Sequence, residues 1–267
     1  MNDTTFKGID PGVNRRDLLR DGITTSSTCR YGVMKWLTTD HGVGQQLALY
    51  GEYSEGELVL LRRLVKPGNT IITAGANIGA HVIPLSLMVG GLGSVIAFEP
   101  QPFIIPILEE NLRVNRCEYN VRLYKAGLGD HTHRGRIAST DPTLPNNFGG
   151  LHVLPEGNEH IQGADIDIVT IDSFGFEWID LIMLDVEGSE EAALRGARAT
   201  IDRCRPLLYV EIDKEDRREP LLHYIRDELK YEILFHLPYV YNPDNVLKNP
   251  ENHFPDQRSI MCLAVPQ

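Results

Sequence analysis

A glycine turn at Gly75-Ala76-Asn77-Ile78-Gly79 and the carboxylate of Glu99 are the groups whose spacing first suggests a chemical role. A turn of this kind after a buried strand lets a ligand approach the backbone closely. A carboxylate at the end of the following strand can accept hydrogen bonds from both hydroxyls of a ribose. The pair therefore predicts a nucleoside-containing cofactor, bound beyond the carboxyl ends of two parallel strands.

A second group of acidic side chains follows a strongly apolar stretch over residues 179–184. Asp185 and Glu187 come after it, where a carboxylate could take the proton of a hydroxyl group that acts as a nucleophile. We therefore predict Asp185 and Glu187 as catalytic residues. Further candidates for the base are His81, Glu211 and His236. Three of these carboxylates could instead hold a divalent cation, but we expect no metal.

Apolar strands that alternate with helices must position these groups. Residues 69–74 and 94–98 are expected as buried strands on either side of a helix over 80–89. Further strands are expected over residues 121–126, 179–184, 207–212, 231–237 and 259–265. This alternation predicts a doubly wound α/β fold with seven strands. The last two strands have no helix between them, which is compatible with an antiparallel hairpin at the C-terminus.

The rest of the chain is predicted to form an N-terminal extension and one insertion. Residues 1–66 are expected to hold an arm up to Ser27, a strand over 30–38 and helices over 45–50 and 55–65, and residues 67–267 the main domain. Ser54 and Glu57 have the spacing of a capping box, and Ser189 is expected to cap a helix over 190–201. The insertion, at about 135–171, contains a long loop around Asn146–Gly150. Long loops in small domains are often functional, so we expect a lid or binding loop there.

Composition excludes several classes of protein. The net charge of −11 and the isoelectric point of about 5.3 argue against a general nucleic-acid partner, which needs clustered Lys and Arg. No apolar run approaches the ~20 residues of a membrane span, and the N-terminus lacks a signal-peptide core. The four cysteines are scattered, as expected for reduced thiols in a cytoplasmic protein. The oligomeric state is not predicted.

Several motifs resemble one known family. The runs GANIGAH at 75–81, AFEP at 97–100 and LDVEGSE at 184–190 resemble the FkbM family of S-adenosylmethionine-dependent methyltransferases. GEYSEGEL at 51–58 and ALRGA at 193–197 extend the resemblance over residues 51 to about 211. It implies the Rossmann-like fold of class I methyltransferases, with a mostly parallel sheet whose antiparallel strand is supplied by the C-terminal hairpin. It also implies S-adenosylmethionine as cofactor. The family usually has an acidic residue where this chain has Thr73, and a lysine where it has Met183.

The resemblance, together with the strand ends, implies a set of site residues. For the cofactor these are Gly75, Ala76, Asn77, Gly79, Glu99, Pro100, Gly127, Leu128 and Asp185. For the acceptor they are Tyr53, Glu55, Asn147, Gly149 and Glu211.

The function expected from these residues is O-methylation of a small-molecule or sugar hydroxyl. One alternative is an NAD-dependent oxidoreductase that uses the same turn and Glu99. That class prefers a third glycine to receive the pyrophosphate, and His81 and Val82 occupy the region where it would lie. Another alternative is a partner module that keeps the fold without catalysis, which Thr73 and Met183 leave open.

Overall fold

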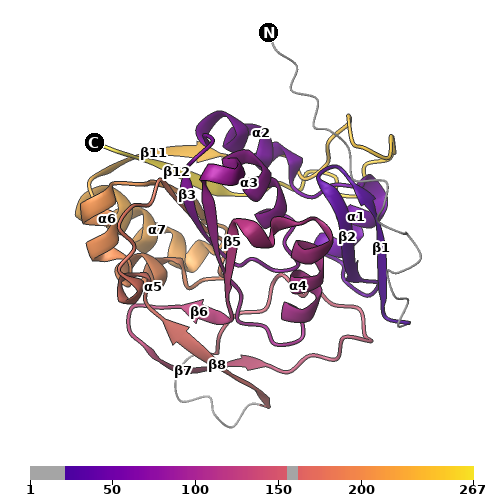
Figure 1. Cartoon of the computed structure of the whole chain (residues 1–267), viewed down its shortest axis with the longest axis horizontal. Coiled ribbons are helices and arrows are strands. Elements are labelled where there is room, and N and C mark those ends of the chain that lie inside the picture. The colour runs from indigo at the N-terminus through magenta and orange to yellow at the C-terminus, as the bar shows by residue number, and fades with distance from the viewer. Residues whose placement is uncertain (1–21, 155–161) are drawn as a thin grey trace.

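A seven-stranded sheet forms the centre of the structure (Figure 1), a computed structural model that describes residues 22–154 and 162–267. Its strands, in spatial order, are β11 (Tyr231–His236), β12 (Met261–Pro266), β10 (Leu207–Glu211), β9 (Leu181–Leu184), β3 (Thr70–Ala74), β4 (Ser94–Phe98) and β5 (Val121–Tyr124). Neighbours from β10 to β5 are parallel, and β12 is antiparallel to both β10 and β11. The predicted fold class, including the C-terminal hairpin, is confirmed.

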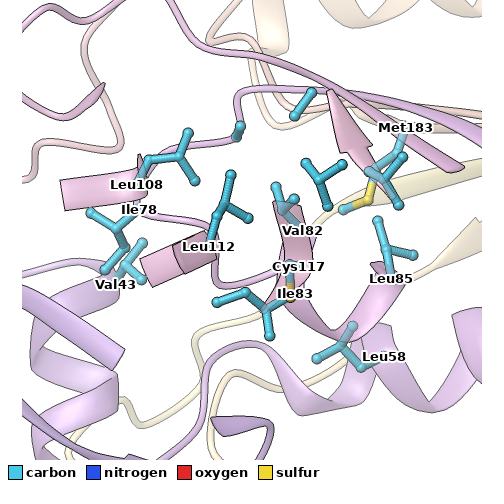
Figure 2. Close-up of a cluster of buried hydrophobic side chains, with 14 of the residues drawn as sticks. Val43, Leu58, Ile78, Val82, Ile83, Leu85, Leu108, Leu112, Cys117 and Met183 are labelled. Carbon is cyan, nitrogen blue, oxygen red and sulfur yellow. The ribbon is translucent and has the colours of Figure 1, made fainter. Parts of the chain in front are cut away.

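The central strands are buried on both faces, which explains their nearly continuous apolar sequences. In β3, Ile71 packs into one hydrophobic cluster and Ile72 into another on the opposite face. Helices α2 (Glu55–Leu64), α3 (Val82–Val89) and α4 (Ile105–Val114) cover the first face. Helices α5 (Glu190–Arg195), α6 (Arg198–Cys204) and α7 (Glu215–His223) cover the second. Figure 2 shows part of the first cluster, with Leu58, Val82, Ile83, Leu85 and Met183.

An N-terminal hairpin packs beside α4. Strands β1 (Thr24–Cys29) and β2 (Gly32–Leu37) are antiparallel, and α1 (Val43–Tyr50) follows them. The prediction of a mobile or loosely docked arm up to Ser27 is therefore wrong for residues 24–27, where backbone pairing with β2 overrides a polar Thr/Ser sequence. The rest of the predicted arm, residues 1–21, lies outside the described residues.

The insertion forms a second, three-stranded sheet. Strand β6 (Ala126–Leu128) follows β5 closely and pairs in parallel with β8 (Gly163–Val169), which pairs antiparallel with β7 (His133–Ala138). The loop after β7 returns to the N-terminal hairpin, because His41 N donates to Asn146 O and Asn146 N to Thr39 O. The central part of the predicted loop, Asn146–Gly150, is thus fixed against the region that follows β2. Residues 155–161 lie outside the described part.

Two predicted helix caps are wrong. Ser54 has a left-handed backbone (φ 43°) and makes no capping side-chain bond, and Glu57 accepts a hydrogen bond from the Ser259 hydroxyl instead. Ser189 makes no capping bond either, and the Glu190 carboxylate instead folds back to accept from Val186 N and Gly188 N, which precede the helix. The helix expected over 190–201 is divided into α5 and α6 beside Gly196, where a Cβ atom would lie 2.0 Å from Gly129 O.

Short helical turns complete the described chain. Three are 3-10 helices, η1 (Gly90–Leu92), η2 (Cys117–Tyr119) and η3 (Ile171–Phe174), and the π-helical turn η4 (Tyr224–Glu228) extends α7. In the described ranges, every helix is too short or too polar to cross a bilayer. All four cysteines are buried free thiols.

Thr73 and Met183, the two departures from the family pattern, are neighbours in the sheet. They are register partners in the parallel strands β3 and β9, so their side chains lie on the same face. Thr73 is 2% exposed and Met183 packs in the first hydrophobic cluster.

Asn111 on α4 joins the hairpin to the glycine turn. Its side chain accepts a hydrogen bond from Lys35 N and donates to Lys35 O and Ile78 O, at 2.7 to 2.8 Å. Because these groups are buried, we expect Asn111→Ala to lower the free energy of unfolding by about 3 kcal/mol, measured by urea denaturation. Glu110→Ala, which removes only the exposed pair with Arg113, is the control, and we expect a change below about 1 kcal/mol. Equal losses for the two variants would contradict this role.

Candidate functional site

A cavity of about 800 Å³ opens at the carboxyl ends of the central strands. Four segments that directly follow or end these strands line it: residues 74–77 at β3, 98–101 at β4, 185–187 at β9, and 211, 213 and 214 at β10. Carboxyl ends of parallel strands are where doubly wound sheets bind their ligands. Both groups of residues that the sequence analysis picked out therefore meet in one cavity.

Further parts of the wall come from three segments that sequence reasoning covered only in part. They lie within residues 41–46 beside α1, 147–153 in the insertion and 240–259 before β12. Asn147 and Gly149 are the acceptor residues predicted in the second segment, and both line the cavity. The other two segments carried no readable motif, since only the tertiary contacts of the loops bring them to this edge.

The glycine turn forms one end of the cavity and is fixed by a close backbone contact. Gly75 has φ +81°, and a Cβ atom there would lie 1.7 Å from Asp185 O. Gly75, Ala76 and Asn77 line the cavity, whereas Gly79 faces away from it and packs on Leu108 of α4. The turn thus keeps its backbone accessible while its last glycine serves helix packing.

Glu99 is held at the same end by the backbone. Its side chain is 1% exposed, and it accepts hydrogen bonds from Asn77 N at 2.7 Å and Gln101 N at 2.9 Å. Burial raises the pKa of Glu99 to about 7, although the two backbone bonds oppose the rise. Each oxygen retains acceptor capacity for a ligand donor. Pro100, Gly127 and Leu128 line the cavity beside it.

The other end of the cavity is strongly acidic. Carboxylate oxygens of Asp185, Glu187 and Glu211 lie within 4.8 Å of one another. Burial, and then the charges of Glu187 and Glu57, raise the pKa of Asp185 to about 8. Burial and the charge of Asp185 also raise the pKa of Glu211. At neutral pH this pair therefore retains a proton.

Glu187 is held by an ion pair. Its backbone is left-handed (φ 54°), which is unusual for a residue with a Cβ atom. Lys214 Nζ lies 2.6 Å from both Glu187 Oε2 and Asp213 Oδ2. Burial lowers the pKa of Lys214, but the bonds to Asp213 and Glu187 outweigh it and raise that pKa overall. Glu187 is therefore a paired carboxylate, and this part of the site holds its backbone in a strained conformation.

His81 lines the cavity next to Tyr53, their rings packed edge to face at 5.3 Å. Its Nε2 is 3.6 Å from Glu57 Oε2. Burial lowers the pKa of His81, and the charge of Glu57 opposes this. His236 is not among the residues that line the cavity, and its Nδ1 is 2.8 Å from the Tyr209 hydroxyl.

Glu55, predicted to face the acceptor, lies away from the cavity. Its carboxylate accepts from the Tyr31 hydroxyl at 2.7 Å and from Arg62, and it is 3.6 Å from Arg30. These contacts with the hairpin and α2 turn the first residue of α2 outward. Tyr53, two residues earlier, remains in the wall.

Buried polar atoms that lack a hydrogen-bond partner are concentrated around this cavity. Within residues 22–154 and 162–267, four buried side-chain polar atoms have no partner. Three belong to residues of the cavity wall, namely His81 Nε2, Gln101 Oε1 and Glu211 Oε2. Buried polar atoms are normally satisfied, so their gathering here marks a functional region.

A family comparison agrees with this geometry. The model of the Methyltransferase FkbM domain matches residues 74–237, which is more than half of the chain and includes both ends of the cavity. The chain belongs to the FkbM methyltransferase family. A search of the curated proteins finds no match.

Solved structures resemble this member of the FkbM methyltransferase family at low sequence identity. A methyltransferase FkbM of Methylobacillus flagellatus is 21% identical, with a TM-score of 0.49, over 74% of this chain and 43% of that chain. The chain thus spans less than half of the length of that relative. A putative rRNA methylase of Clostridium thermocellum is 14% identical over 81% of this chain and 97% of that chain, with a TM-score of 0.47. An S-adenosylmethionine-dependent O-methyltransferase of Thermotoga maritima is 16% identical over 79% and 64%, with a TM-score of 0.46.

The close approach of Gly75 to Asp185 O predicts that a side chain at position 75 destabilises the protein. Gly75→Ala would place a methyl group against a backbone oxygen, so we expect a loss of at least about 3 kcal/mol in the free energy of unfolding. Gly68→Ala is a matched control, because Gly68 has a similar φ (+90°) but nothing within 4 Å of its Cβ position. We expect only about 1 kcal/mol there, from backbone strain. Urea denaturation measures both, and similar losses would show that the contact is unimportant.

Proposed function

We propose that the protein transfers the methyl group of S-adenosylmethionine to a hydroxyl of a small molecule or sugar. One observation carries the proposal: a single cavity joins a ribose-type carboxylate, Glu99, to an acidic cluster at its other end. S-adenosylmethionine has a matching distribution of groups, with a nucleoside at one end and a sulfonium cation near the other. The family supports methyl transfer.

The proposed cofactor site uses the residues that follow β3, β4, β5 and β9. Glu99 would accept from the ribose hydroxyls, and the turn at Gly75–Asn77 would approach the nucleoside through its backbone. Pro100, Gly127 and Leu128 would pack around the base. Asp185 would lie near the sulfonium, where a carboxylate lowers the energy of a buried cation.

The acceptor would enter from the wall formed by Tyr53, Asn147, Gly149 and Glu211. A Cβ atom on Gly149 would be 3.2 Å from Asn77 Nδ2, so the insertion approaches the glycine turn closely. Such an arrangement would align acceptor, methyl and sulfur for in-line displacement, which is mainly a matter of positioning. Asp185 and Glu187 would shape the electrostatic field around the reacting groups.

Calorimetric titration with S-adenosylmethionine and, separately, NAD tests the cofactor. We expect binding of the first alone, because the carboxylates of Asp185 and Glu187 would repel a pyrophosphate. A screen of hydroxyl compounds with methyl-labelled cofactor then tests the acceptor class. Binding of NAD alone would favour the oxidoreductase alternative, and cofactor binding without transfer would favour a partner module.

Glu99→Ala is expected to weaken binding of S-adenosylmethionine about tenfold or more, since hydrogen bonds to a charged acceptor contribute about 1.5 to 3 kcal/mol. Calorimetry measures the dissociation constant. Glu232→Ala, an exposed position on β11, is the control and should leave it unchanged. Wild-type affinity in the Glu99 variant would remove this carboxylate from the site.

The charge of the sulfonium should make binding depend on pH. The pKa of Asp185 is raised to about 8 in the free protein, and a bound cation stabilises the ionised form. Binding therefore releases protons, and affinity should rise with pH. S-adenosylhomocysteine is neutral at sulfur, so the ratio of its dissociation constant to that of S-adenosylmethionine should increase roughly tenfold between about pH 6 and about pH 8.5. Any effect of Glu99 is common to both ligands. A constant ratio would place the sulfonium away from Asp185.

A further inference from the structure

The two ring nitrogens of His81 have different surroundings. Nε2 is buried, has no hydrogen bond and lies 3.6 Å from Glu57 Oε2. Nδ1 is not among the buried unpartnered atoms, and no hydrogen bond joins it to any described residue. The side chain keeps 11% of its surface exposed, and His81 lines the cavity. One nitrogen thus points to a carboxylate and the other remains open to a ligand.

Glu57 is fixed behind the imidazole. It is 4% exposed and is not among the cavity-lining residues. Its Oε1 accepts from the Ser259 hydroxyl at 2.6 Å, and the charge of Glu57 acts on the nearby Tyr209 hydroxyl. A carboxylate beside Nε2 favours the tautomer that carries its proton on that nitrogen. This tautomer leaves a free electron pair on Nδ1.

The other candidate bases are already engaged. Burial and nearby carboxylates raise the pKa values of Asp185 and Glu211, so this pair retains a proton at neutral pH. Glu187 is paired with Lys214 at 2.6 Å. His236 is bonded to Tyr209. Of the candidates named from the sequence, His81 alone combines an unengaged nitrogen with a place in the cavity wall, among the residues that the structure describes.

We propose that His81 is the general base of the methyl transfer and that Glu57 is its positioning residue. This inference rests on the proposed function. The acceptor O–H proton moves to His81 Nδ1 while the oxygen electron pair forms the new bond to the methyl carbon. The methyl–sulfur bond breaks, and its electrons remain on sulfur as a neutral thioether. The imidazolium that results is balanced by Glu57 and afterwards releases its proton to solvent.

The groups around His81 determine the pH dependence of this step. Glu57 from α2 faces Nε2, Tyr53 packs on the ring, and Tyr209 from β10 lies behind Glu57. The charges of Asp185 and Glu211 act on Tyr53 from the far side. Burial lowers the pKa of His81, so the imidazole is neutral at pH 7. The rate should therefore rise with pH and level off once the imidazole is neutral.

Single-turnover transfer from methyl-labelled cofactor to the best hydroxyl acceptor of the screen tests the role. We expect His81→Asn to bind S-adenosylhomocysteine within about threefold of wild type but to transfer about 100-fold more slowly, without the rising limb of the pH profile. In Glu57→Gln the rising limb of the pH–rate profile should move to lower pH, since loss of the carboxylate charge lowers the pKa of the His81 imidazole. His223→Asn, which removes an exposed imidazole beside Asp227, is the control.

Nitrogen NMR of labelled histidine in the free protein gives a second test that needs neither cofactor nor acceptor. We expect a neutral His81 with its proton on Nε2 at about pH 7.5. A proton on Nδ1, or wild-type transfer rates in His81→Asn, would overturn the proposal. An unmoved pH limb in Glu57→Gln would overturn the role of Glu57. Failure to bind S-adenosylmethionine would instead count against the proposed function, and the tautomer measurement would still decide the geometry of His81.

Discussion

The contact between the backbones of Gly75 and Asp185 is the constraint on which the site depends. Strands β3 and β9 are neighbours in the sheet, and their exits touch where a side chain on residue 75 would have to lie. The nucleoside end and the acidic end of the cavity are therefore parts of one rigid backbone unit. Their separation is set by the sheet and not by flexible loops, which suits a reaction that depends on alignment.

The second property of the site is its excess of buried negative charge. Asp185, Glu187 and Glu211 are crowded together, and Lys214 balances only part of their charge. Such crowding lowers the stability of the folded protein, because like charges in a poorly solvated site repel one another. A positively charged ligand would relieve it. Binding of a cation would therefore lower the electrostatic energy of the site, and stored energy of this kind is common in functional regions.

Much of the fold could be predicted from the sequence, because strands that are buried on both faces have nearly continuous apolar sequences. Residues 94–98 were predicted with the observed bounds, and Glu99 was placed at the end of its strand. Strand β1 was missed, because Thr24–Cys29 has a polar sequence and pairs only through the hairpin.

The directions of side chains were harder to predict than the positions of helices and strands. Glu55 and Tyr53 stand two residues apart, yet only Tyr53 reaches the cavity, because Arg62 and Tyr31 hold Glu55 elsewhere. The Ser54 cap failed for a similar reason, since Glu57 bonds to Ser259, far along the chain. Spacing along the sequence predicts local geometry, but it cannot show which distant partner competes for a polar group.

The pairing of Thr73 with Met183 gives the departures from the family pattern a common explanation. An acid at the first position and a lysine at the second would face each other across β3 and β9 and neutralise one another in the core. This chain has an uncharged residue at both positions, so neither leaves an isolated buried charge behind. Replacing either residue alone by a charged one would leave an unpaired charge in the core, so the two positions are coupled through stability and only a paired exchange keeps the core neutral.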